Sequence, residues 1–230
     1  DDHAIVWGRA HILNSKPDQA VYDLHVPVVE HYSAEGFWHH NSGKTAAGAV
    51  KTLMKIDQGK PGIMVAPDFP HFTKSTWPEF KKWCPWDRVT NGNLKHPYTQ
   101  EKILWFRTKH GEVPLYYGGI DDPESWTGPT VNFFWFDEGR RKQKRNAFDI
   151  LAGRIRTGHK PQGFVTTSPA GINHWLYDIF VNKTFYNLEL VQEELERVGQ
   201  PLCEYVRAET KQNRNNLDPL YYYSLLSLYT

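Results

Sequence analysis

The tetrapeptide Ser42-Gly43-Lys44-Thr45 stands directly before a stretch of small residues, Ala46 to Lys55, that has a helical pattern. A phosphate site needs backbone amides at a helix start, a lysine for the phosphate oxygens and a hydroxyl for Mg²⁺, and this tetrapeptide supplies them in order. It therefore predicts that Ser42, Gly43, Lys44 and Thr45 bind a nucleotide such as ATP. Alone, the tetrapeptide is equally compatible with an ordinary helix start.

Two carboxylates follow a buried strand farther along the chain. The apolar run 131–136 ends in Asp137 and Glu138. We expect Asp137 to share a Mg²⁺ ion with Thr45, and Glu138 to polarise the attacking water as a general base. A solvated acidic turn is the alternative interpretation.

A third motif, Thr166-Thr167-Ser168-Pro169, ends the next apolar strand with hydroxyl groups. We expect Thr167 and Ser168 to hydrogen-bond the terminal phosphate or Glu138. The three motifs, in this order, are typical of an ATPase with a phosphate-binding loop.

The spacing of the apolar runs predicts the fold. Helical patterns, among them Phe72–Trp83, alternate with short strand patterns, which predicts an α/β domain whose mostly parallel sheet carries helices on both faces. The residues around His110-Gly111-Glu112 indicate a hairpin. The expected strands are Gly62–Ala66, Lys102–Arg107, Val113–Tyr117, Val131–Phe136 and Gly163–Thr167.

Composition excludes several other classes of protein. Lys and Arg total 27 against 26 Asp and Glu, so the net charge of +1 gives no general attraction to nucleic acid. Two cysteines, Cys84 and Cys203, cannot form a disulfide framework, and no apolar run is long enough to span a bilayer. We expect a soluble protein of a reducing compartment, and a fragment, because the chain begins at Asp1 without a methionine.

From residue 42 to about 223 the chain resembles the ATPase domain of phage terminase large subunits. Besides the motifs above, the resemblance rests on four segments: Ile63–Pro67, Asp121–Gly128, Leu151–Arg156 and Glu209–Pro219. It implies ATP and Mg²⁺ as cofactors, viral double-stranded DNA, the small terminase subunit and a portal ring as partners, a homo-oligomer, no membrane, and the cytoplasm of an infected bacterium. It also implies that residues 209–230 lead toward a nuclease domain that is not part of this chain.

Two groups of basic residues have open interpretations. Arg156, with Arg154, would contact ATP phosphate or a neighbouring subunit, or is a solvated helix-end charge. The run 140–145 would face DNA or the next subunit, or is a solvated surface. A helicase or another DNA translocase with the same loop remains the alternative to a terminase.

The phosphate-binding loop has one defect. The pattern GxxxxGK[ST] requires glycine five positions before Gly43, and that position holds Trp38. A bulky side chain prevents the tight turn that glycine provides there. We therefore expect the chain as written to bind and hydrolyse ATP poorly.

Residues 1–41 suggest a reason for this defect, because they resemble the C-terminal end of an intein. The resemblance rests on 21–26 (Tyr-Asp-Leu, then Val), 31–37 (ending Ala-Glu-Gly-Phe) and His40-Asn41 before Ser42. It implies that the Asn41 side chain attacks its own carbonyl, that His40 protonates the leaving amine, and that Ser42 is the acyl acceptor. Splicing would need no cofactor, and the partner would be an N-terminal intein half and N-extein, in cis or in trans.

The resemblance carries two further roles and leaves some alternatives. Asp23 would orient groups around Ser42, and His31 or Glu30 would fill the place of an earlier histidine, because the family spacing falls on Glu30. A zinc site of His25, His31, His39 and His40 is one alternative, and a simple β lead-in is another. The expected organisation is a short all-β intein segment (1–41), the ATPase domain (42–208) and a lead-out (209–230).

Overall fold

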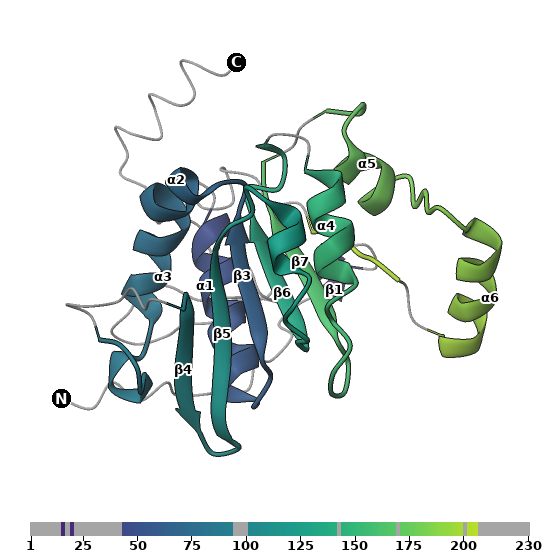
Figure 1. Cartoon of the computed structure of the whole chain (residues 1–230). Coiled ribbons are helices and arrows are strands. Elements are labelled where there is room, and N and C mark those ends of the chain that lie inside the picture. Colours follow the sequence, from purple (N-terminus) through teal and green to yellow (C-terminus); the bar gives the residue numbers. More distant parts are fainter. Residues whose placement is uncertain are drawn as a thin grey trace.

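The computed structural model describes residues 43–93, 101–141, 144–168, 171–199 and 202–206, together with two short strands, β1 (Ser15–Lys16) and β2 (Gln19–Ala20) (Figure 1). These strands pair antiparallel, with Lys16 opposite Gln19. The rest of the expected intein segment and the lead-out lie outside the described residues.

The central feature of the fold is a sheet with the strand order β4-β5-β3-β6-β7. Strands β3, β5, β6 and β7 are parallel, as expected, whereas β4 runs antiparallel to β5 at one edge. Only two residues join β4 to β5, and so short a connection allows no parallel crossover. The strands are β3 (Gly62–Ala66), β4 (Ile103–Thr108), β5 (Gly111–Gly119), β6 (Phe133–Asp137) and β7 (Gln162–Thr166).

The two central strands are apolar on both faces because both faces are covered. Every residue of β3 and β6 is buried. In β6, Phe133 and Trp135 belong to the core on one face, and Phe134 and Phe136 to the core on the other. This two-residue alternation explains why β6 reads as an uninterrupted apolar run.

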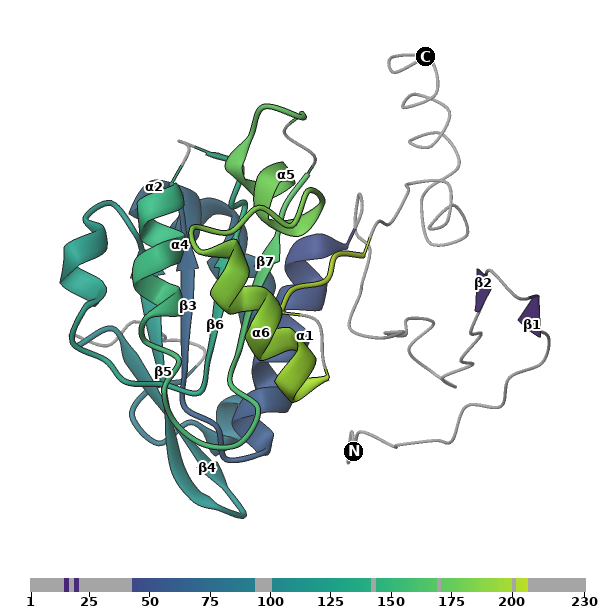
Figure 2. The same cartoon turned by 90° about the vertical axis from the view of Figure 1, so that its right-hand side faces the viewer.

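Helices cover both faces, which confirms the expected layers. The face of Trp135 packs against α1 (Lys44–Asp57) and against a helical segment made of α2 (Phe69–His71), η1 (Phe72–Thr76) and α3 (Trp77–Trp83). The opposite face packs against α4 (Arg145–Ala152) and α5 (Trp175–Phe180). Figure 1 shows α1 and α4 on opposite sides of the sheet, and Figure 2 shows the same layers edge-on.

Three shorter or more peripheral helices complete the described structure. The 3₁₀ turns η2 (Trp86–Arg88) and η3 (Pro123–Trp126) lie in connections between strands. Helix α6 (Leu188–Val198) stands apart from the sheet beyond α5 (Figure 1). None of the helices in the described ranges is long and apolar enough to cross a membrane.

The helix expected at Phe72–Trp83 is present but begins earlier and contains a wide turn. Asp68 starts it, because its carboxylate accepts a 2.6 Å hydrogen bond from the His71 N–H. Residues 72–76 form a π-helical turn in which the Trp77 N–H donates to the Phe72 carbonyl, five residues back. Pro78 has no N–H and its ring would crowd the carbonyl of Lys74, so a local widening relieves the conflict that proline creates inside a helix.

Candidate nucleotide site

The loop before α1 has the backbone of a phosphate site. Gly43 caps α1 with φ 59°, a left-handed conformation that glycine adopts without strain. No acidic side chain occupies the first turn of α1, so no carboxylate of the helix itself competes with an anion for its positive dipole end. Lys44 and Thr45 are the first two residues of this helix.

Asp137, at the end of β6, is the most constrained polar group of the site. Its carboxylate is buried, with 1% of the residue exposed, and accepts hydrogen bonds from three hydroxyl groups. Thr166 donates to Oδ1 at 2.7 Å, Thr76 to Oδ2 at 2.7 Å, and Thr45 to Oδ1 at 3.3 Å. Thr45 and Asp137, predicted to share a metal, are thus in contact although 92 residues separate them.

The environment of Asp137 works in two directions on its pKa. Burial raises the pKa because it removes water from the charged form, and the neighbouring Glu138 carboxylate adds to the rise. The hydrogen bonds from Thr166 and Thr76 oppose it by stabilising the carboxylate. The net pKa lies above the ordinary value for aspartate.

Glu138 occupies a strained position beside the same pocket. Its φ of 49° is left-handed, which is uncommon for a residue with a side chain. Its Oε2 is buried and accepts no hydrogen bond in the described structure, while Arg140 Nε and Arg141 Nε lie 3.6 and 3.9 Å away. A carboxylate with an unused acceptor suits a group that receives a proton from water.

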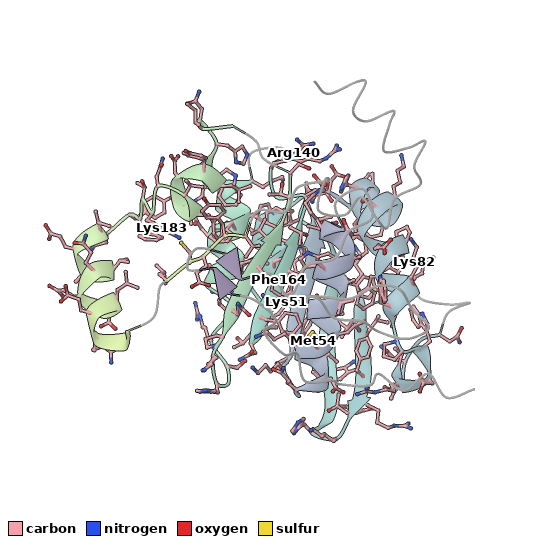
Figure 3. All side chains as sticks on the ribbon, turned by 180° about the vertical axis from the view of Figure 1, so that it is seen from behind. Lys51, Met54, Lys82, Arg140, Phe164 and Lys183 are labelled. Atoms are coloured by element: carbon pink, nitrogen blue, oxygen red, sulfur yellow. The ribbon has the colours of Figure 1, made fainter. Side chains whose placement is uncertain are left out.

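A cavity of about 520 Å³ lies at this point, and its lining includes Lys44, Thr45 and Glu138, whereas Asp137 is buried behind Thr45. The α1 side supplies residues 43–46, and Glu138 and Ser168 come from the ends of β6 and β7. The opposite wall is one stripe of the π-turn and α3: Lys74, Ser75, Pro78, Glu79 and Lys82. Figure 3 shows Lys82 on α3 and Arg140 in the loop after β6.

The hydroxyl motif at the end of β7 contacts protein groups that the sequence did not predict, and the expected contact of Thr167 and Ser168 with phosphate stays a prediction. Thr166, rather than Thr167, contacts an acidic residue, and that residue is Asp137 rather than Glu138. The Thr167 hydroxyl accepts from the Arg140 N–H at 3.1 Å and so holds the loop that follows Glu138. Ser168 lines the cavity. Alternation along β7 explains this: Thr166 points into the sheet layer beside Asp137, and the next residue points the other way.

Arg156 is not brought to this site. Its N–H donates to the Val131 carbonyl at 3.0 Å, and Val131 precedes β6, whereas Asp137 ends it. At about 3.3 Å per residue of extended chain, roughly 20 Å separate Val131 from Asp137. Arg154 lies at the same distant end, where its guanidinium donates to the Thr127 carbonyl.

The five residues expected to act in splicing or in the first part of the loop lie outside the described residues. They are Asp23, His31, His40, Asn41 and Ser42, and the histidines of the alternative zinc site lie there too. In the described ranges no three His, Cys, Asp or Glu side chains come together as a metal cluster.

Sequence reasoning missed three residues of the site. Thr76 and Lys74 lie in a helix with no motif of its own, and only tertiary packing places them here. Thr166 belongs to the motif Thr166-Thr167-Ser168-Pro169, and the alternation of side chains along β7 predicts that it faces Asp137. A threonine at the end of an apolar strand, in register with Asp137, is the signal that would have singled it out.

Hydroxyl and carboxylate oxygens are the ligands that Mg²⁺ prefers, and the Thr45 hydroxyl, which lines the cavity, lies 3.3 Å from the Asp137 carboxylate. The unused acceptor of Glu138 adds negative charge nearby. The residues present therefore fit a magnesium ion held with a nucleotide.

The fold of this domain, a five-stranded mixed sheet with helices on both faces, has solved counterparts. The large terminase of a thermophilic bacteriophage matches with a TM-score of 0.60 and 15% identity, over 80% of this chain and 42% of that one. The complex of the same phage terminase with ADP matches with a TM-score of 0.58 and 13% identity, over 80% and 41%. This chain therefore spans less than half of that terminase, and at these identities the likeness concerns the fold.

The family is given by the sequence itself. Residues 40–220 match the family described as the N-terminal part of the T4likevirus-type terminase large subunit, and the chain belongs to this family. A search of curated protein sequences found no match.

Proposed function

We propose that the domain from Ser42 onward hydrolyses ATP as the motor domain of a phage DNA-packaging terminase. The observation that carries the proposal is the hydrogen bond from Thr45, which lines the cavity together with Lys44 and Glu138, to the buried carboxylate of Asp137. Family membership and the ADP complex of the thermophilic phage terminase support it.

Each side chain has a distinct task in this proposal. Lys44 and the α1 amides neutralise the phosphates, and Thr45 with Asp137 would hold Mg²⁺, which stabilises the developing phosphate charge when bound. Glu138 accepts the proton of the attacking water. Thr167 holds the backbone of Arg140 and thereby the loop that aims Glu138.

The family also supports proposals on partners. Double-stranded viral DNA, the small terminase subunit, a portal ring and further copies of this chain are the proposed partners, in the cytoplasm of an infected bacterium. The basic run offers Arg140 and Arg141 near Glu138, and Lys144, whose ammonium donates to the carbonyls of Ile120 and Asp121. These local contacts favour a structural role for much of the run.

The nucleotide proposal is tested by repairing the loop. Trp38→Gly completes the GxxxxGK[ST] pattern, and Asn41→Ala added to it prevents cleavage at residue 41. In calorimetric titrations the doubly substituted chain is expected to bind Mg-ATP, and Lys44→Ala in that background to abolish binding. Tight binding by the chain that retains Trp38 would contradict the view that this residue disables the loop. No binding by the repaired chain would contradict the nucleotide site itself.

We propose further that residues 1–41 are the C-terminal part of an intein that interrupts the phosphate-binding loop. The family match begins at residue 40, next to the proposed junction between Asn41 and Ser42, and this supports a boundary there. The missing glycine at position 38 has the same explanation, because splicing would join Ser42 to an upstream glycine-rich segment.

The splicing proposal predicts one defined product. The chain is expected to release residues 42–230 by cleavage after Asn41, and Asn41→Ala to abolish the release. Asn14→Ala is the matched control in the same segment and should leave the release unchanged. Intact-mass spectrometry identifies the product, and its persistence in the Asn41→Ala variant would point to ordinary proteolysis.

A further inference from the structure

Thr76 is a buried residue of the π-helical turn that no sequence motif marks. It is fully buried, and its hydroxyl lies 2.7 Å from Asp137 Oδ2. A carboxylate oxygen can only accept, so Thr76 donates. The hydrogen bond connects residues 61 positions apart and joins the helix on the cavity wall to the end of β6.

The two oxygens of Asp137 are held from different directions. Thr166 donates to Oδ1, and the Trp135 indole N–H donates to the Thr166 hydroxyl at 2.7 Å, which commits the Thr166 proton to Asp137. Among the described residues, Thr76 alone donates to Oδ2. Thr166 and Thr76 together therefore fix the plane of the carboxylate.

The π-turn contacts the core with some of its side chains and the cavity with others. Phe72, Thr76 and Trp77 point into the core, while Lys74 and Ser75 line the cavity. A π-turn inserted in an α-helix is often found at a functional site, since it costs hydrogen-bond geometry. Here Pro78 disfavours the regular turn, and the wider turn carries Thr76 on the face directed at Asp137.

We propose that Thr76 is a positioning residue of the nucleotide site, which orients the Asp137 carboxylate for the metal ion, and that the π-turn links this carboxylate to the cavity wall formed by Lys74 and Ser75. This inference deepens the proposed nucleotide-binding function and rests on it. Residues that orient a metal-holding group from behind commonly change metal affinity 10- to 100-fold when altered.

The test uses the full chain with the Trp38→Gly and Asn41→Ala substitutions. Thr76→Val removes the donor at nearly constant volume, and Thr76→Ser keeps it. Thr73→Val is the matched control, because that hydroxyl lies in the same turn and donates to the Pro70 carbonyl instead. ADP binding is measured by calorimetry with Mg²⁺ and with EDTA, and Mn²⁺ binding to the ADP complex by electron paramagnetic resonance.

Thr76→Val is expected to lower Mn²⁺ affinity by about 10-fold or more while ADP affinity in EDTA stays at the parent value. Thr76→Ser should restore the affinity, and Thr73→Val should match the parent. Equal metal affinities in the two valine variants would overturn the proposal. So would an equal loss of ADP affinity in EDTA, because that result assigns Thr76 a purely structural role.

A parent that binds no ADP in either condition would refute the proposed function, and the Thr76 contact is then decided separately. Thermal unfolding is then measured for the chain with Trp38 and Asn41 retained, and for its Thr76→Val, Asp137→Asn and doubly substituted variants. Non-additive shifts in Tm show that Thr76 acts through Asp137, and additive shifts overturn the inference.

Discussion

The indole of Trp135 in β6 lies directly against Gly48 of α1, so that a Cβ at residue 48 would overlap the indole at Cε2, Cζ2 and Nε1. The same indole donates to Thr166, which donates to Asp137. A small residue at one position of α1 therefore determines how closely the helix that begins with Lys44 approaches the strand that ends in Asp137.

Gly48→Ala is expected to destabilise the domain in spite of the higher helix propensity of alanine. Overpacking of a dense core costs about 1–3 kcal/mol, which exceeds the roughly 1 kcal/mol that alanine gains over glycine in a helix. Urea unfolding measures the loss. Gly128→Ala is the control, because a Cβ there meets nothing within 4 Å, and a Gly48→Ala variant as stable as this control would contradict the packing argument.

The layers of the fold follow directly from the sequence pattern. Each of the five expected strands overlaps an observed strand. A short apolar run bounded by turn residues is typical of a strand in a sheet that is covered on both faces, so the runs indicate the positions of the strands. The turn residues His110-Gly111-Glu112 likewise predict the hairpin of β4 and β5. The pattern does not predict two boundaries. The strand β7 begins and ends one residue earlier than expected, and the helix expected from Phe72 starts at Phe69, where Asp68 caps it and Pro70 stands in its first turn.

The site was predictable only where a motif carries the chemistry. Thr45, Asp137 and Glu138 belong to motifs, and the structure places Thr45 and Glu138 on one cavity with Asp137 in contact with Thr45. Thr76 reaches Asp137 through a helix whose sequence shows only an apolar stripe, so its role arises from tertiary packing. Arg156 is the converse case, because its place in a resembling segment does not say which end of the sheet that segment occupies, and it lies beside Val131 rather than Asp137. Its contact with a neighbouring subunit stays a prediction.

Lys55 gives a prediction on the pH dependence of stability. Burial lowers its pKa from 10.5 to about 8, and repulsion from Lys60 and Lys51 adds to the effect. Lys51 itself is partly buried beside Phe164, with Nζ 4.9 Å from the ring centroid (Figure 3). Between about pH 8 and 10.5 the unfolded chain binds a proton at Lys55 that the folded chain has released, so this residue makes the free energy of unfolding rise with pH.

Lys55→Gln should therefore stabilise the protein at pH 7 and flatten this rise. Urea unfolding at pH 7 and at pH 9.5 measures both effects. Lys109→Gln serves as the reference, because Lys109 is exposed at the tip of the hairpin and its variant reports what removing a surface charge does. The interpretation fails if the two glutamine variants change the free energy of unfolding equally at both pH values.

Glu138→Gln separates nucleotide binding from hydrolysis. Glutamine keeps the shape of the side chain but cannot take a proton from water, so we expect the hydrolysis rate of the repaired chain to fall about 10²- to 10⁴-fold. The nucleotide should still bind, because Lys44, Thr45 and the α1 amides are unchanged. A phosphate-release assay and a calorimetric titration on the same sample measure the two quantities.

The buried Oε2 of Glu138 makes this substitution informative about stability as well. Among the described residues this oxygen has no hydrogen-bond donor, and the partly exposed side chains of Arg140 and Arg141 lie 3.6 and 3.9 Å from it. Replacing a carboxylate under these conditions removes a desolvated charge at little loss of favourable contact. We therefore expect Tm to stay level or rise while hydrolysis is lost. Glu124→Gln, at an exposed position in η3, should change neither quantity, and a Glu138→Gln variant that hydrolyses ATP as fast as Glu124→Gln would remove Glu138 from the role of general base.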